Sequence, residues 1–222
     1  MYVIEPMTQD DVEEVGRVEQ LCFSNPWPLS AYRRELKNPE QNYYIVLRDD
    51  PNAEPLDHEE LASPEGEDLG LPVRTPRRPR KFALWNLARL RGPENPPPII
   101  GFAGMWMLLD EAHVTTIGVH PDHRGRALGE LMFAALIDEA IRRDISWVTL
   151  EVRVTNETAQ NLYRKYGFSI QGRRPRYYSD NNEDAYIMWS EPLKDEGYRA
   201  RLRQLRRRLI HRMSFDTEIR TS

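Results

Sequence analysis

Apolar and polar positions along the first third of the chain follow first a strand period and then a helix period. Residues 2–7 predict a short strand, and Thr8, which precedes a run of acidic residues, predicts the start of a helix. Apolar side chains then recur every three residues, which predicts a buried stripe of Val12, Val15, Val18 and Leu21. Residues 29–37 predict a second short helix, and residues 42–48 predict another strand.

Regular patterning resumes after residue 98. Strands are predicted at residues 99–108, 113–120, 145–154 and 184–189, and helices at residues 128–143 and 156–166. Gly167 is a natural C-terminal cap for the last of these helices. The longer helix has one apolar face, made by Leu128, Leu131, Met132, Ala135 and Leu136. Strands that alternate with helices predict an α/β (α+β) fold, with helices on the faces of a sheet.

Residues 50–98 have a different composition. Ten of these 49 residues are proline, and an acidic stretch is followed by a basic one. Packed helices and strands rarely tolerate so much proline. We therefore predict a mobile, dispensable insertion within a domain of residues 1–193, with one possible short helix at residues 82–90.

Charge is distributed unevenly along the chain. The formal net charge is −4, but residues 199–212 contain seven arginines and no acid, so the rest has 24 basic and 35 acidic residues. An acidic body favours a cationic macromolecular substrate or partner, although solvated surface charge is an equally good explanation. The basic extension, residues 194–222, has Tyr198, Leu202, Leu205 and Leu209 at helical spacing. This spacing favours packing back against the acidic body, with contact to RNA as the alternative.

The single cysteine, Cys22, excludes an intrachain disulfide and is typical of a reducing compartment. We interpret it as a small buried apolar side chain. The N-terminal residues do not resemble a signal peptide, and no apolar run approaches the ~20 residues that span a membrane. These features predict a soluble, cytoplasmic protein without a membrane partner.

The stretch HPDHRGRALGELM, residues 120–132, predicts an anion site between a strand and a helix. Gly125 and Gly129 allow close approach of the backbone, and the start of the helix leaves N–H groups without intrahelical partners. Arg124 and Arg126 add positive charge, so a pyrophosphate is the expected ligand. The Walker and dinucleotide-binding patterns are both absent. An ordinary turn with solvated arginines is the alternative.

Residues 117–132 (IGVHPDHRGRALGELM) resemble motif A of the GNAT acetyltransferases, whose [QR]-x-x-G-x-[GA] loop holds the pyrophosphate of coenzyme A. Arg124, Ala127 and Gly129 occupy its defined positions, and Ala127 departs from the usual first glycine. Alanine costs little in a helical conformation, but it is strained at positive φ. Residues 150–168, 22–36 and 173–188 are similar to the bacterial ribosomal-protein-alanine N-acetyltransferases of this family.

The resemblance implies a GNAT fold, with a mixed, twisted sheet of about six to seven strands flanked by helices. It implies acetyl-CoA as cosubstrate and no metal. The backbone of Ile117, Gly118 and Val119 would line the pantetheine arm and polarise the acetyl carbonyl, and Asn156 would bind the same arm. The pyrophosphate would be held by Arg124, Gly125, Arg126, Ala127, Leu128, Gly129 and Glu130.

Glu151 and Tyr163 are the predicted catalytic residues. In the strand WVTLEVR, Glu151 lies on the polar face and can act as general base, as the resemblance implies. The alternative is a surface glutamate paired with Arg153 or another arginine. Tyr163 lies two helical turns after Asn156, and the resemblance implies a general acid for the departing thiolate. A tyrosine at this spacing is otherwise an ordinary core residue.

Trp27, Tyr177 and Tyr178 are weaker candidates for the acceptor site. The resemblance implies that the acceptor is a protein N-terminus, the alanine of a small-subunit ribosomal protein. Two alternatives stay open from the sequence. The same chemistry could act on lysine or a small amine, or the chain could be a non-catalytic acetyl-CoA-binding module.

Overall fold

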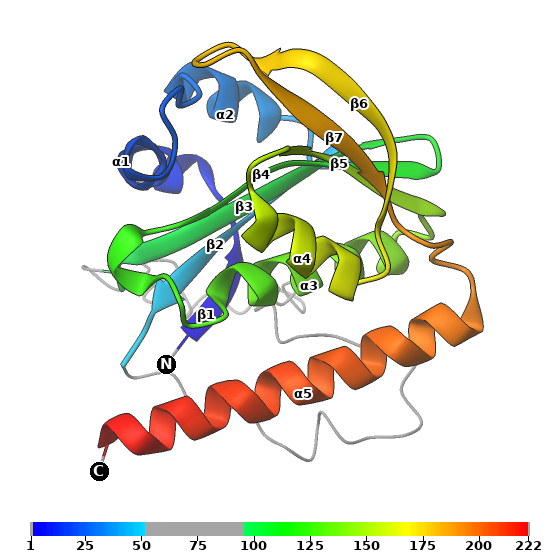
Figure 1. The fold of residues 1–222 in the computed structure, drawn as a ribbon. Helices are drawn as coiled ribbons and strands as arrows, with labels where there is room; N and C mark the ends of the chain where they lie inside the picture. The colour runs from blue at the N-terminus through cyan, green and yellow to red at the C-terminus, as the bar shows by residue number, and fades with distance from the viewer. Residues whose placement is uncertain (1, 52–95, 222) are drawn as a thin grey trace, which may run out of the picture.

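Seven strands form one mixed sheet in the part of the chain that a computed structural model describes, residues 2–51 and 96–221, with side chains to Met213 (Figure 1). The order across the sheet is β1-β2-β3-β4-β5-β7-β6. The strands are β1 (Tyr2–Pro6), β2 (Asn42–Asp49), β3 (Ile99–Leu108), β4 (Glu111–Val119), β5 (Trp147–Arg153), β6 (Ser169–Tyr178) and β7 (Glu183–Trp189). Neighbouring strands are antiparallel except for β4 and β5, which are parallel and are joined through a crossover helix. The predicted fold class and strand number are therefore confirmed.

Helices cover both faces of this sheet (Figure 1). They are η1 (Gln9–Asp11), α1 (Val12–Cys22), α2 (Leu29–Glu35), η3 (Pro121–His123), α3 (Leu128–Arg142), α4 (Glu157–Lys165) and α5 (Glu196–Thr221). Alternate side chains of β2 divide between the two layers. Ile45 and Leu47 join the core beneath α3 and α5, whereas Tyr44 and Val46 join the core beneath α1.

The predicted start of the first helix is confirmed, whereas its predicted buried face is confirmed only in part. Thr8 begins the helical segment, and its N–H and hydroxyl both donate to Asp11 Oδ2 at 2.7 Å. Val12, Val15 and Val18 are buried as predicted, but Leu21 is 55% exposed, so this part of the prediction is wrong. Each three-residue step falls short of a full turn by about 60°, so three steps carry Leu21 to the side opposite Val12.

β6 is a strand that we did not predict. It is the last of the described strands in the sheet, pairs with β7, and is exposed along nearly its whole length. Its sequence, SIQGRRPRYY, has neither a buried face nor apolar alternation, and Pro175 lies within it. Proline is tolerated in an edge strand, where one row of backbone groups has no partner strand.

α3 is buried on more sides than its pattern predicted. The predicted face, Leu128 to Leu136, is buried, but so are Phe133, Ala134, Ile137 and Ala140. α5 accounts for the difference, because its Tyr198, Leu202 and Leu209 join the same core as α3. Ion pairs Arg206–Asp138 and Arg212–Glu130 run along the two antiparallel helices. The predicted packing of the basic extension against the acidic body is therefore confirmed.

Most of the proline-rich segment, including the possible helix at residues 82–90, lies outside the described residues. In the part of the chain that the structure does describe, we find no helix long and apolar enough to cross a membrane.

Candidate active site

β4 and β5 separate in the middle of the sheet. They pair only from Glu111 with Trp147 to Val114 with Leu150, although β4 continues to Val119. Thr115 falls outside the register between β3 and β4, where Met105 pairs with Val114 and Gly104 with Thr116. Such a bulge bends and twists its strand. The second half of β4 therefore turns away from β5, whose own second half pairs with β7.

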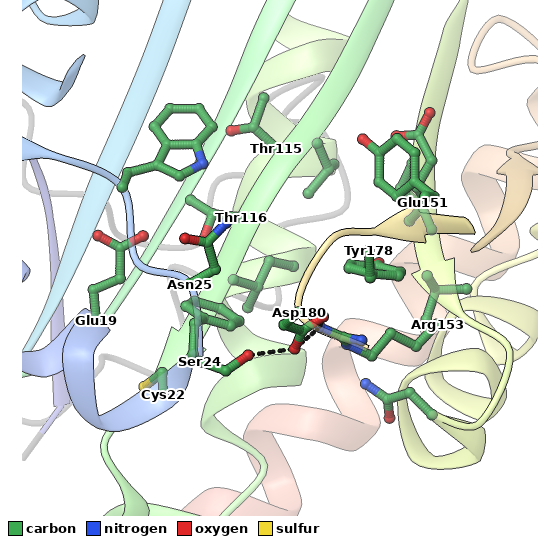
Figure 2. Close-up of a pocket in the computed structure, with 18 of the residues that line it drawn as sticks. Glu19, Cys22, Ser24, Asn25, Thr115, Thr116, Glu151, Arg153, Tyr178 and Asp180 are labelled. Carbon is green, nitrogen blue, oxygen red and sulfur yellow. Dashed lines mark hydrogen bonds and ion pairs between the residues drawn. The ribbon is translucent and has the colours of Figure 1, made fainter. Parts of the chain in front are cut away.

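A cleft of about 510 Å³ opens where these strands separate. Figure 2 shows Glu151 and Tyr178 on one side of it and Glu19, Cys22, Ser24 and Asn25 on the other, with Thr115 and Thr116 of β4 between them. The cleft brings together predicted site residues that lie far apart in the sequence. They are Trp27, Ile117, Glu151, Asn156, Tyr163, Tyr177 and Tyr178.

The Glu151 carboxylate is nearly enclosed, and its side chain is 6% exposed. Its Oε2 lies 2.9 Å from His113 Nε2, and its Oε1 lies 3.3 Å from Arg174. Burial raises the pKa of Glu151, but the hydrogen bond from His113 and the charges of His113 and Arg174 outweigh it, so the pKa lies below its ordinary value. Glu151 is therefore ionised at neutral pH and able to accept a proton. The alternative, a surface glutamate paired with an arginine, is met in part: Glu151 does pair with an arginine, Arg174, but it is not a surface residue. Arg153 binds Asp180 and Glu183 instead.

The Tyr163 ring packs against Phe133 and Phe168, and its centroid lies 5.0 Å from that of Phe133 and 6.2 Å from that of Phe168. It is a core residue and also a cleft residue, so the two interpretations of its spacing are compatible. Burial, together with the nearby Tyr178, raises the pKa of Tyr163 far above its ordinary value. Tyr163 thus keeps its proton at neutral pH. Nearby, Asn156 caps α4 by accepting from the Ala159 N–H at 3.1 Å, which leaves its amide N–H groups for other partners.

The turn before α3 has the backbone that an anion site requires. Gly125 has φ +78°, and a side chain added there would meet nothing within 4 Å. Arg124 lies against the end of β4, where its Nε donates to the Val119 carbonyl at 3.1 Å. The first N–H groups of α3 have no intrahelical acceptor, and the helix dipole adds positive potential at this end.

Ala127 adopts the conformation that is strained for alanine. It precedes α3 with φ +59° and ψ 14°, in the left-handed region. A non-glycine residue there costs roughly 1–2 kcal/mol, which the surrounding structure must offset. Its side chain packs against the core beneath α3 and recovers part of that cost.

The Glu130 side chain is directed away from the turn. Its Oε1 accepts from Lys165 at 2.5 Å and from the Tyr166 hydroxyl at 3.1 Å, and its Oε2 accepts from Arg212 at 2.8 Å. Only the Glu130 backbone remains for a phosphate. Its carboxylate instead joins the beginning of α3 to α4 and α5.

Three further features, none of which was predicted to belong to the site, complete the cleft. Ser24 donates to Asp180, which also pairs with Arg153, so a bridge crosses from the segment after α1 to the turn between β6 and β7 (Figure 2). The Trp106 ring on β3 lies 6.0 Å from Trp27 and 6.3 Å from His113. Cys22 is not fully buried, contrary to prediction, and donates to Val119 O at 3.2 Å. These contacts join segments far apart in sequence and leave no local signal.

This combination of an open strand edge, a glycine turn before a helix, and a carboxylate and a protonated tyrosine that line one cleft is that of an acetyl-CoA-dependent N-acetyltransferase. The chain belongs to the acetyltransferase (GNAT) family. The sequence pattern of this family matches residues 57–168, about half of the chain.

Among relatives, the N-alpha-acetyltransferase RimI of Mycobacterium tuberculosis is 29% identical over 188 residues, covering 82% of this chain and 87% of that protein. The [ribosomal protein bS18]-alanine N-acetyltransferase of Escherichia coli K12 is 40% identical over 89 residues, covering 39% and 60%. The crystal structure of the ribosomal-protein-S18-alanine N-acetyltransferase from Escherichia coli shares the fold. Its TM-score is 0.62 at 23% identity, over 88% of this chain and 96% of that one.

Proposed function

We propose that the enzyme acetylates the α-amine of a protein N-terminus, namely the N-terminal alanine of a small-subunit ribosomal protein. The transfer is direct, with Glu151 as general base and Tyr163 as general acid. One observation carries the mechanism: the ionised Glu151 and the protonated Tyr163 line a single cleft at the point where β4 leaves β5.

Acetyl-CoA fits the residues around this cleft. At Ile117, Gly118 and Val119 the edge of β4 is not paired with β5. The Val119 carbonyl accepts from Cys22 and Arg124, and the other backbone groups of this edge can bind the pantetheine arm. The pyrophosphate binds at the turn formed by residues 125–130. The backbone there is open at Gly125. Arg124 and Arg126 supply positive charge. The amide of Asn156 lies in the cleft and binds the same arm.

The chain's own groups then supply the proton transfers. Glu151 removes a proton from the acceptor ammonium, because its carboxylate is ionised at neutral pH. A backbone N–H of β4 polarises the acetyl carbonyl in the manner of an oxyanion hole. The neutral amine attacks the acetyl carbon and the C–S bond breaks. Tyr163 donates its proton to the departing sulfur. It is reprotonated by the second proton that the nitrogen loses as the amide forms.

An α-amine suits this arrangement better than a lysine. The reference pKa is ~8 for an α-amine and ~10.4 for lysine, so a larger fraction of the former is already neutral at pH 7. One carboxylate without a raised pKa then suffices as the base. Acidic side chains of Glu19, Glu151 and Asp180 line the cleft and favour a cationic N-terminus. Two relatives of the chain are an N-alpha-acetyltransferase and a bS18-alanine N-acetyltransferase, which supports the same acceptor.

The test is acetylation of peptides that begin with alanine and contain one internal lysine, with mass spectrometry locating the acetyl group. We expect the α-amine to be acetylated and the lysine to be untouched. A second peptide with a blocked N-terminus and the same lysine should not react. Acetylation of lysine in both peptides, with the alanine unmodified, would overturn the acceptor assignment.

The control is Glu151→Gln, which keeps the shape of the side chain and removes the base. Its turnover should fall about 100-fold or more while its affinity for coenzyme A is unchanged. A variant that retains wild-type turnover would remove Glu151 from the mechanism.

A further inference from the structure

His113 lies between the proposed base and a second polar group of the sheet. The parallel register sets His113 of β4 opposite Thr149 of β5. Thr149 and Glu151 point to the same face because they are two residues apart in a strand. The imidazole consequently reaches both, with Nε2 at 2.9 Å from Glu151 Oε2 and Nδ1 at 2.9 Å from Thr149 Oγ1.

The hydrogen bonds of Thr149 decide which ring nitrogen carries a proton. The Thr149 hydroxyl donates to Glu111 Oε1 at 2.7 Å, which uses its only proton. Its oxygen must then accept from His113 Nδ1–H. A proton is also required between Nε2 and Glu151 Oε2, since two lone pairs facing each other at 2.9 Å would repel. The ring therefore donates on both sides, and the assignment follows from the network.

The bond to Glu151 does not depend on which group donates between His113 and Thr149. In the tautomer with a bare Nδ1, the Thr149 hydroxyl donates to that nitrogen instead of to Glu111. Nε2–H then still points at Glu151. Glu111 and Thr149 thus keep the imidazole in the orientation that holds the carboxylate, as a third group orients the base in other acyl-transfer sites.

The two oxygens of Glu151 consequently have different roles. Oε2 is committed to His113, in a line of groups that includes the buried Thr149. Oε1 faces Arg174, whose side chain is 54% exposed and reaches it at 3.3 Å. An acceptor ammonium can displace this exposed arginine far more easily than the His113 ring.

The geometry points to His113 as a positioning residue for the acetyl transfer: held by Thr149 and Glu111, it orients the Glu151 carboxylate and leaves Oε1 for the acceptor amine. This inference rests on the proposed role of Glu151 as the base. The other titratable or charged groups that face the pair are Arg174, Tyr177 and Tyr178. The Trp106 ring packs beside the imidazole.

The experiment compares kcat, KM and the pH profile of wild type with those of His113→Ala, His113→Gln and Thr149→Val, using an alanine peptide and acetyl-CoA. We expect kcat of His113→Ala to fall about tenfold or more, with KM for acetyl-CoA within about twofold. His113→Gln keeps an N–H donor and should recover part of the loss. Thr149→Val removes the group that orients the ring, so it should lower kcat severalfold with little effect on folding.

The pH profile separates positioning from a general structural role. His113 lowers the pKa of Glu151, so removing it should raise that pKa and move the acidic limb of kcat to higher pH. Arg174→Gln is the matched control because it also removes a positive neighbour of Glu151. It should move the acidic limb in the same direction but keep kcat within about threefold, since charge is lost without loss of orientation.

Three outcomes would overturn the inference. The first is kcat within twofold of wild type for His113→Ala while Glu151→Gln is inactive. The second is an equal loss of kcat in Arg174→Gln, which would show that the loss of a neighbouring charge, and not of orientation, lowers kcat. The third, decisive if His113→Ala does not fold, is an unchanged acidic limb in both His113→Gln and Thr149→Val. Wild-type turnover in Glu151→Gln would instead overturn the proposed function itself.

Discussion

The ion pair between α3 and α5 offers a quantitative test of the packed basic extension. Arg206 is only 5% exposed on α5, and the Asp138 side chain that it contacts on α3 is 12% exposed. Burial lowers the pKa of Arg206 to about 10, so the guanidinium is still charged at neutral pH. Arg206→Met keeps most of the apolar stem and leaves the Asp138 carboxylate buried without a counter-charge.

Removing one partner of a buried pair costs about 3–5 kcal/mol, whereas replacing both by apolar groups is often neutral. For a chain of this size, 1 kcal/mol corresponds to roughly 2–4 °C in Tm, so Arg206→Met should lower Tm by about 6–20 °C. Asp138→Leu alone should be similarly destabilising. The double variant should recover most of the loss, giving a coupling free energy of several kcal/mol in a double-mutant cycle measured by calorimetry.

Arg207→Met is the control, because Arg207 is the next residue along α5 and is exposed. It should change stability by no more than about 0.5 kcal/mol. The reasoning is refuted if Arg206→Met costs less than about 1 kcal/mol, the range of a solvated surface pair, or if the two single changes add without coupling.

Gly129→Glu should abolish coenzyme A binding in calorimetry by placing a carboxylate at the turn. Gly129→Ala should bind nearly as wild type, because its Cβ meets only Val119 Cγ2 at 3.9 Å; equal binding by both variants would remove the turn from the site. Tyr163→Phe should lower kcat about tenfold or more without changing coenzyme A affinity, and unchanged kcat would exclude it as the acid. Glu130→Gln should cost about 1–3 kcal/mol at pH 7, because a buried acceptor of three hydrogen bonds loses its charge. Burial raises the pKa of Glu130, but Lys165 and Arg212 outweigh it and hold the pKa below its ordinary 4.5. Its contribution is complete above pH 4.5 and is lost as the pH falls through the folded value. The difference between wild type and variant in unfolding free energy should shrink below pH 4.5, and a constant difference would contradict the assignment.

Much of the fold could be predicted from local sequence, because short-range periodicity determines where strands and helices form. The run HVTTIGVH, the Gly125 turn and the apolar face of α3 were each recognisable within about a dozen residues. The exposed strand β6 was not predicted, because an edge strand with little buried face has little alternation of apolar and polar residues to detect. Leu21 was misplaced because a three-residue repeat drifts around a helix.

By itself, the sequence determined the order of the elements other than β6, the glycine turn before α3, and Glu151 and Tyr163 as candidates. Only the tertiary structure decided what these residues face. The bulge at Thr115 separates β4 from β5, and the register between them brings His113 to Glu151 across the sheet. Tertiary packing also directs the Glu130 side chain toward Lys165 and Arg212, away from the glycine turn that its position in the sequence suggested. The physical reason is that local periodicity sets which face of an element a residue occupies, whereas its charge partners come from strands and helices distant in sequence.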